Sequence, residues 1–215
     1  MNWVLRTLST SVGKKQLMAV SGLLFLLFLA THLLGNLSIY GGPAAFIAYA
    51  QRLHALGNLL AVAEVGMAVA LIIHVTTAVF LFFENRRARP VGYEVDQSGG
   101  GRTFSSQTMP YTGLLILGFI GVHLATFSHH IVDQTRRNIF QIAVAVLSQK
   151  VYLAIYLLGV LVVAFHVRHG LWSAFQTVGA NHPKYMPFIQ KLSLVFAVIV
   201  ALGFGSLPFA ILSMR

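Results

Sequence analysis

Long runs of apolar residues alternate with short polar segments along this chain. Five of these runs are each about 20 residues long, which is the length that an α-helix needs to cross a bilayer. They cover approximately residues 17–38, 61–83, 111–131, 151–172 and 188–212. We therefore predict an all-α integral membrane protein, folded as a bundle of five transmembrane helices. The first run is long and is followed by no small-residue cleavage pattern, so we expect it to remain as a helix rather than to be removed as a signal peptide.

The composition agrees with this class. Hydrophobic residues make up 57% of the 215 positions, charged residues only 9%, and the mean hydropathy is +0.77. A soluble domain carries roughly a quarter of charged residues. The chain contains 0 cysteines, which excludes disulfides, cysteine-ligated iron–sulfur clusters and a thiol nucleophile within it.

The one clearly polar linker covers residues 84–110. It holds Arg86, Arg87 and Arg89 and the three glycines at 99–101. We predict an exposed loop there, mobile at its tip. We find no internal repeat and no polar stretch long enough for a second domain, so residues 1–215 are expected to form a single domain.

The net charge of +10 lies mainly in the connecting segments and therefore predicts topology rather than nucleic-acid binding. With the N-terminus inside, ten basic residues fall on the cytoplasmic side and five on the other side, which favours a cytoplasmic N-terminus and an outside C-terminus. The inner ten are Arg6, Lys14, Lys15, Arg86, Arg87, Arg89, Arg102, Arg168, Lys184 and Lys191. The outer five are Arg52, Arg136, Arg137, Lys150 and Arg215.

The first four apolar runs each place a histidine well inside the run. A titratable side chain within a bilayer is costly, and it is a functional hypothesis by default. At the rise of an α-helix, His32 and His123 lie about 22 and 18 Å from the inner boundary, and His74 and His166 lie about 14 and 9 Å from it. The four helices therefore present two pairs of imidazoles at two depths.

Two imidazoles from facing helices are axial ligands that the iron of haem b accepts, and a bundle interior suits its apolar ring. We therefore predict two haems stacked across the membrane. Three small residues near the histidines either make room for the rings or only mediate helix packing: Gly35, Gly121 and Gly170. A proton relay or a transition-metal site is the alternative use of the histidines. A metal site, however, requires ligands that converge at one depth, together with carboxylates or thiols.

The other five histidines are weaker candidates. Four of them are expected to be solvated or interfacial: His54 and His182 in loops, and His129 and His130 at the outer end of the third run. His169 lies about one turn after His166 on the same face. It could replace His166 as a ligand, or bond to a haem propionate or to a quinone; we prefer the deeper His166.

Two segments carry a resemblance to a known family. Residues 11–22 read Ser-Val-Gly-Lys-Lys-Gln-Leu-Met-Ala-Val-Ser-Gly and are followed at 31–36 by Thr-His-Leu-Leu-Gly-Asn. Residues 165–172 read Phe-His-Val-Arg-His-Gly-Leu-Trp, in which a glycine follows the histidine by four. Together with the five runs and the four histidines, they resemble the cytochrome b membrane-anchor subunit of succinate dehydrogenases and fumarate reductases, in its five-helix, two-haem class.

The resemblance implies a role in an assembly. Such subunits dock a flavoprotein subunit and an iron–sulfur subunit on the cytoplasmic face of the cytoplasmic (inner) membrane, and they pass electrons to or from a membrane quinone, which by resemblance is menaquinone. The substrate chemistry belongs to the flavoprotein, so no catalytic residue is expected in this chain. By resemblance the inner haem is ligated by His74 with His166, and the outer haem by His32 with His123.

Basic residues near the boundaries are candidates for binding haem propionates or are topology determinants only. The candidates are Lys14, Arg168 and His169 inside, and Arg52, Arg136 and Lys150 outside. Glu64, near the outer start of the second run, is either a proton donor to the quinone or an interfacial side chain. Some fumarate reductases of this class have a glutamate two residues before the fourth-helix ligand; here Ala164 stands at that place, so a proton path there is not expected.

Two other classes compete with this interpretation. Anchors of nitrate reductases, formate dehydrogenases or hydrogenases also bind haem, but they usually concentrate their histidines on fewer helices. A non-redox transporter with structural histidines normally shows helix-breaking residues at the midplane, whereas the prolines here fall nearly all in predicted loops, with Pro208 as the exception.

Overall fold

The computed structural model describes residues 2–88 and 104–215, and this part of the chain is helical with no strand. Five helices are long and apolar enough to cross a membrane, which confirms the prediction of an all-α, multi-pass membrane protein. They are α2 (Ser11–Asn36), α4 (Asn58–Arg87), α5 (Phe104–Phe127), α7 (Lys150–Thr177) and α8 (Met186–Ser213). A short 3-10 helix, η1 (Leu37–Gly41), extends α2.

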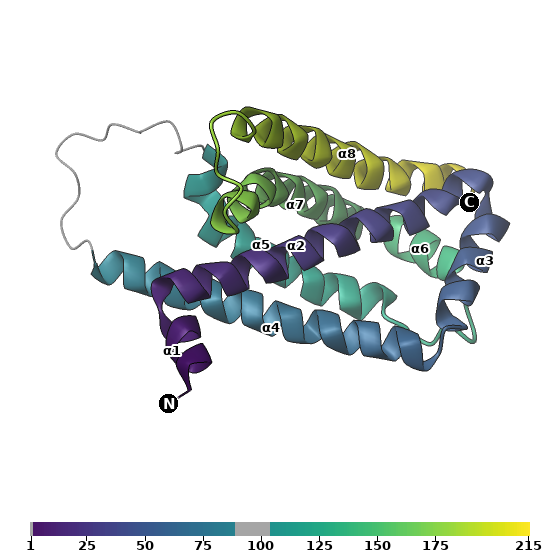
Figure 1. Cartoon of the computed structure of the whole chain (residues 1–215). Coiled ribbons are helices and arrows are strands. Elements are labelled where there is room, and N and C mark those ends of the chain that lie inside the picture. Colours follow the sequence, from purple (N-terminus) through teal and green to yellow (C-terminus); the bar gives the residue numbers. More distant parts are fainter. Residues whose placement is uncertain (1, 89–103) are drawn as a thin grey trace.

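The five long helices run side by side, and the two termini lie at opposite ends of the bundle (Figure 1). We call these the N-terminal end and the C-terminal end. Helix α7 is central, because it packs against α2, α5 and α8. Helix α4 packs along α2 but touches α5 only sparsely. Large apolar side chains remain exposed along the outer faces of the long helices, as expected for surfaces that face lipid.

Three short helices were not predicted: α1 (Trp3–Ser9), α3 (Pro43–His54) and α6 (Ile139–Leu147). Helix α3 lies across the C-terminal end of the bundle (Figure 1). It is bounded by Gly42 and Gly57, whose φ angles of 93° and 52° fall where a side chain is strained. Helix α6 begins with a capping box between Asn138 and Gln141. Both helices pack into an apolar core at this end, through Phe46 of α3 and Leu147 of α6 among others.

Several predicted boundaries were wrong. The third span ends at Phe127 rather than at residue 131, so His129 and His130 lie in the turn after it. His54 is the last residue of α3 and not part of a loop. The predicted linker is largely helical at its edges, because α4 continues to Arg87 and α5 begins at Phe104; its central part, with Arg89, the glycines at 99–101 and Arg102, lies outside the described residues.

The prolines are also less confined to loops than expected. Pro110 lies inside α5, in addition to Pro208 inside α8. Pro110 is the seventh residue of α5, beyond the first turn in which a proline costs no backbone hydrogen bond.

Candidate functional site

The inner pair of histidines comes from α4, which carries His74, and from α7, which carries His166. Each ring is held by a hydroxyl from the neighbouring helix. His74 Nδ1 lies 3.0 Å from Ser21 Oγ on α2, and His166 Nδ1 lies 3.0 Å from Thr112 Oγ1 on α5. The two rings are therefore fixed in the same way from two different helices.

The hydroxyls also determine which nitrogen of each ring carries the proton. Ser21 Oγ donates its own proton to the carbonyl oxygen of Leu17, at 2.8 Å. With its proton directed to this carbonyl, the oxygen accepts from His74 Nδ1–H, because a hydroxyl has one proton to give; this direction is assigned from the hydrogen-bond network. The lone pair of His74 is thereby left on Nε2, which is the form that a metal-binding imidazole needs.

The same reasoning applies to His166. Thr112 Oγ1 donates to the carbonyl oxygen of Thr108 at 3.0 Å, so it too accepts from Nδ1–H of the histidine. Within the described part of the chain, the Nε2 of neither inner histidine has a hydrogen-bond partner. Both inner imidazoles are therefore prepared to bind an electron-pair acceptor through Nε2.

Glycines let the two helices approach the inner rings closely. A Cβ placed on Gly22 would lie 3.4 Å from His74 Cε1, and one placed on Gly113 would lie 3.6 Å from His166 Cε1. Each of these glycines directly follows the hydroxyl residue that holds the ring. A Ser-Gly dipeptide on α2 and a Thr-Gly dipeptide on α5 thus contact the two inner histidines in the same way: the hydroxyl lies beside Nδ1, and the glycine lets the helix backbone approach the ring.

The outer pair joins α2 to α5. The rings of His32 and His123 lie with their centroids 5.8 Å apart and their planes at 86°. An imidazole nitrogen binds a transition metal at about 2 Å, so two imidazoles on opposite sides of one ion have centroids about 6 Å apart. The observed spacing is therefore close to the spacing that a shared axial ion requires.

Aromatic side chains enclose the outer pair. Phe28 stacks on His32 at 5.3 Å, and Phe204 of α8 lies 5.6 Å from it. Phe119 and Phe127 lie on either side of His123, at 6.1 and 5.7 Å. Packing of flat rings, rather than a short hydrogen bond, positions the outer imidazoles.

In the described chain, the side chain of His123 has one polar neighbour, the hydroxyl of Tyr156 on α7, at 3.5 Å from Nδ1. The same hydroxyl contacts Thr126 Oγ1, and Thr126 donates its proton to the carbonyl oxygen of Val122. With Thr126 assigned as the acceptor from Tyr156, the tyrosine oxygen accepts from His123 Nδ1–H, which is the protonation form assigned to the inner pair, through a longer contact.

The site is built from two corresponding halves of the chain. In the first, Ser21-Gly22 precedes His32 by 11 and 10 residues; in the second, Thr112-Gly113 precedes His123 by the same numbers. The hydroxyl and the histidine that it holds are 53 residues apart in the first half and 54 in the second. Each half consists of a long helix, a short helix and a long helix: α2, α3, α4 and then α5, α6, α7. We did not find this correspondence in the sequence, where it becomes visible only after the two halves are aligned on their histidines.

The correspondence sets the distance between the two tiers of histidines. On both α2 and α5, the residue at the inner tier and the histidine at the outer tier are 11 residues apart, which is about 16 Å along the helix axis. The structure brings the rings of His32 and His123 together, whereas the pairing of His74 with His166 stays a prediction.

The three glycines that the sequence analysis singled out differ in their surroundings. The side-chain position of Gly35 is occupied by the ring of Tyr49, so this glycine serves helix packing. A Cβ on Gly121 or Gly170 would meet no atom within 4 Å. Gly121 is exposed, so the open space beside it belongs to the outer surface, and of the three glycines Gly35 alone is required by a close contact in the described chain.

His169 has a buried Nδ1 without a hydrogen-bond partner, and its ring packs edge-on against Trp172 at 4.8 Å. An unsatisfied buried polar atom costs about 1–3 kcal/mol, so this nitrogen is suited to a polar group of a ligand. Arg168 is exposed, and in the described chain its only polar contact is through its backbone oxygen, from Ser193 Oγ at 2.8 Å. Lys14, a candidate for a propionate, is paired with Glu84.

A second group of histidines gathers around Glu64 at the C-terminal end. His130 Nε2 lies 3.0 Å from Glu64 Oε2, and His129 Nδ1 lies 3.7 Å from Oε1. The ring of His54 lies 4.7 Å from that of His129. Burial and the neighbouring His129 lower the pKa of His54, and Glu64 opposes this shift. Sequence reasoning missed this group, because its members come from three elements whose ends were placed wrongly.

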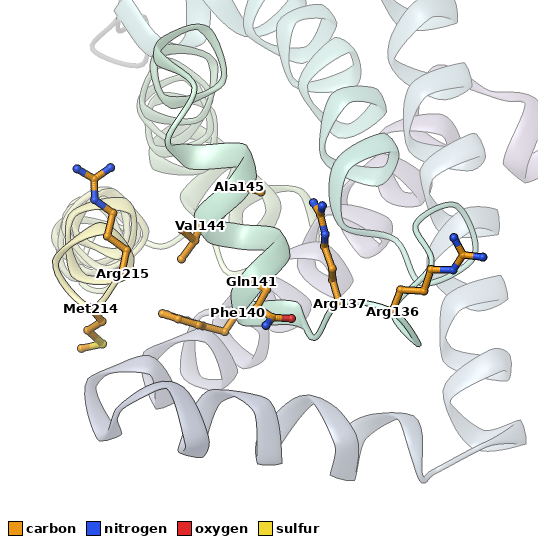
Figure 2. A pocket seen from close by; sticks show the side chains of 8 residues that line it. All are labelled: Arg136, Arg137, Phe140, Gln141, Val144, Ala145, Met214 and Arg215. Atoms are coloured by element: carbon orange, nitrogen blue, oxygen red, sulfur yellow. The ribbon is translucent and has the colours of Figure 1, made fainter.

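The four side chains line a pocket of about 290 Å³, together with Gly57, Leu60 and Ala61. A larger pocket of about 620 Å³ lies between α6 and the end of α8 (Figure 2). Arg136, Arg137 and Arg215 line it, but none of the four bundle histidines does. Arg136, an expected propionate partner, also forms an ion pair with Asp133 at 3.4 Å.

Comparison of the chain with protein-family models, curated proteins and solved structures finds no match. The geometry of the described residues is therefore the basis for a functional proposal.

Proposed function

We propose that this chain is the dihaem cytochrome b membrane-anchor subunit of a succinate:quinone oxidoreductase, either a succinate dehydrogenase or a fumarate reductase. The observation that carries the proposal is the pair of histidine tiers, each formed by two helices, at about 16 Å from each other. The motif resemblance described above supplies the class of complex. The geometry supplies the reason to expect two haems.

The donor set fits haem b. Neutral imidazoles with the proton on Nδ1 and the lone pair on Nε2 are axial ligands of haem iron, and hydrogen bonds to Nδ1 orient such ligands. His74 and His166 have short bonds of this kind, and His123 has a long one. Bound haems would supply one-electron redox chemistry at the two tiers. The residues of this chain hold the imidazoles in position and in one tautomer.

His169 and Arg168 are proposed to bind the propionates of the inner haem. Among the described residues, the Nδ1 of His169 and the guanidinium of the exposed Arg168 have no polar partner, and both side chains lie within three residues of His166. Charged and buried polar groups at the membrane boundary are the partners that carboxylates require. Lys14 is a weaker candidate because Glu84 already neutralises it.

Glu64 remains the candidate proton donor to a quinone, proposed to be menaquinone. On α4 it lies ten residues before His74, which is about 15 Å toward the C-terminal end. Its carboxylate contacts His129 and His130 in the turn after α5, so it lies beyond the outer pair, at the boundary of the bundle at this end. A carboxylate at the boundary beside the outer tier supports proton delivery to a quinone there.

The proposed orientation places the N-terminal end in the cytoplasm, at the inner membrane of the cell. Basic residues at this end of the described chain outnumber those at the other end, in agreement with the positive-inside rule. The iron–sulfur and flavoprotein subunits would bind at this end, where basic loops can complement acidic partner surfaces.

A difference spectrum of the purified chain tests the proposal. The dithionite-reduced minus oxidised spectrum, with haem quantified as the pyridine haemochrome, is expected to show two low-spin b haems per chain. His32→Ala and His166→Ala are each expected to lose one haem, while His182→Ala, in an exposed turn at the N-terminal end, keeps both. A folded chain that binds no haem, even when haem is supplied during expression, would overturn the electron-transfer role.

A further inference from the structure

Glu64, His129 and His130 form a compact set of potential metal ligands outside the two tiers. One nitrogen of each ring and one carboxylate oxygen all lie within 4.8 Å of one another. Glu64 lies in the second turn of α4, and the two histidines lie in the turn that follows α5. Both segments belong to the C-terminal end of the bundle (Figure 1). We propose that these three side chains bind a divalent transition-metal cation of the zinc type.

The distances fit ligands of one ion. Zinc binds imidazole nitrogen and carboxylate oxygen at about 2.0–2.1 Å, which places the atoms of a tetrahedral set about 3.3 Å from each other. The two contacts of Glu64, at 3.0 Å to His130 and 3.7 Å to His129, lie on either side of that value. The third pair of ligand atoms, on His129 and His130, lies within 4.8 Å, so rotations of these side chains are needed to bring all three ligands onto one ion.

The ligand chemistry selects the kind of cation. Imidazole suits zinc, copper and nickel, whereas magnesium and calcium prefer sets made of oxygen atoms. Two imidazoles and one carboxylate, with a fourth position open, form a set that zinc uses in proteins. The ring of His54 lines the same pocket and is the nearest further nitrogen ligand, while water can occupy the position otherwise.

The local charges permit a cation here. Glu64 supplies a negative charge at the site, and no cationic side chain lines the pocket apart from histidines that can remain neutral. The nearby Arg136 is held by Asp133. The side chains of Glu64, His129 and His130 are 38%, 32% and 65% exposed, so an ion reaches them from solution without opening the fold.

The proposed cation is independent of the haems, since none of its ligands belongs to either tier. It does compete with one feature of the proposed function, because Glu64 cannot bind the ion and pass a proton to a quinone at the same time. Haem content and metal content are therefore separate measurements on the same protein.

The test is zinc binding to the untagged, full-length chain in detergent. The chain is first treated with a chelator, then equilibrated with zinc chloride and freed of excess metal by gel filtration. Zinc is measured by mass spectrometry and its affinity by titration calorimetry. We expect Glu64→Gln and His130→Ala each to hold one zinc fewer per chain than the wild type, with an affinity at this site at least about tenfold lower. His182→Ala should bind as the wild type does, and pyridine haemochrome should show unchanged haem in all three variants.

X-ray absorption at the zinc edge of the wild-type protein keeps the test decisive if a variant fails to fold. A first shell of nitrogen and oxygen at about 2.0 Å with scattering from two imidazoles supports the site. Zinc content that is the same in Glu64→Gln, His130→Ala and the wild type would overturn the proposal, as would a wild-type protein that takes up no zinc.

Discussion

The inner and outer histidine pairs are built from matching parts of the chain but are held in different ways. The inner rings are anchored by hydroxyls at 3.0 Å and approached by glycine backbone. The outer rings are enclosed by phenylalanines, and in the part of the chain that the structure describes only His123 has a side-chain polar neighbour, at 3.5 Å. A hydrogen bond fixes both the direction and the protonation of an imidazole, whereas aromatic packing fixes its direction alone. We therefore expect the two tiers to respond differently to substitutions around the rings.

The largest effect should come from the choice between His166 and His169. Of the two, His166 alone forms a hydrogen bond with Thr112 within the described chain. His166→Ala should remove the inner haem completely, while His169→Ala should keep both haems and change only the affinity for the inner one. Haem stoichiometry by pyridine haemochrome measures this. Loss of a haem in His169→Ala with retention in His166→Ala would reverse the ligand choice.

Removing a hydroxyl should shift the reduction potential of the inner tier. Thr112→Val keeps the shape of the side chain but leaves Nδ1–H of His166 without an acceptor. The imidazole becomes less basic and stabilises ferric iron less, so the inner potential should rise by a few tens of millivolts, which corresponds to a hydrogen bond worth about 1 kcal/mol. Spectroelectrochemical titration should show the outer potential unchanged, and Ser21→Ala should act in the same direction.

Tyr156→Phe is the matched change at the outer tier and should have the smaller redox effect. It removes a long contact to His123 and a short one to Thr126. We expect an outer potential within about 20 mV of the wild type and a loss of roughly 1 kcal/mol in stability, since the Thr126 bond contributes to packing rather than to the ring. An outer shift as large as the inner shift in Thr112→Val would remove the distinction between the tiers.

The smallest expected effect concerns the histidines outside the membrane-spanning helices, and it is a change in stability with pH. The pKa of His54 is lowered from its usual 6.5 by burial and by His129, so the unfolded chain takes up its proton more readily than the folded chain. Its contribution to stability is therefore present above about pH 6.5 and is lost as the pH falls below that value. The effect should be well under 1 kcal/mol because the side chain is largely exposed. Thermal unfolding between pH 5 and 8 should show a slightly flatter profile for His54→Asn than for the wild type.

The two tiers could be predicted from the sequence because they depend only on helix length and on position along each helix. An error of a few residues at a helix end moves all depths by a few ångströms and leaves the pairs intact. The histidine group around Glu64 depends instead on turns. Its geometry required the end of α5 at Phe127 and the extra helix α3, neither of which the hydropathy pattern indicates.

The hydroxyl partners were missed for a different reason. Ser21 and Thr112 look like ordinary small residues of apolar helices, and each satisfies its own proton on the backbone of its helix. Only their three-dimensional placement beside His74 and His166 shows a role. The Ser-Gly and Thr-Gly steps, with nearly equal spacings to two histidines, were a usable signal that a search for repeats by residue identity does not detect.

The division of the ligands between the two halves has a consequence for how the protein is made. The half that emerges first from the ribosome carries His32 and His74, one member of each pair, and the second half carries His123 and His166. Neither half holds a complete pair, so an ion or haem bound at either tier links the two. The outer link needs only α5, which carries His123, whereas the inner link needs α7, which carries His166, so the inner link can form only after α7 has entered the membrane. In the folded chain, α4 has few direct contacts with α5. Ligation at the inner tier would then be a late step of biogenesis, in which the bound group links two halves of the chain that were inserted in succession.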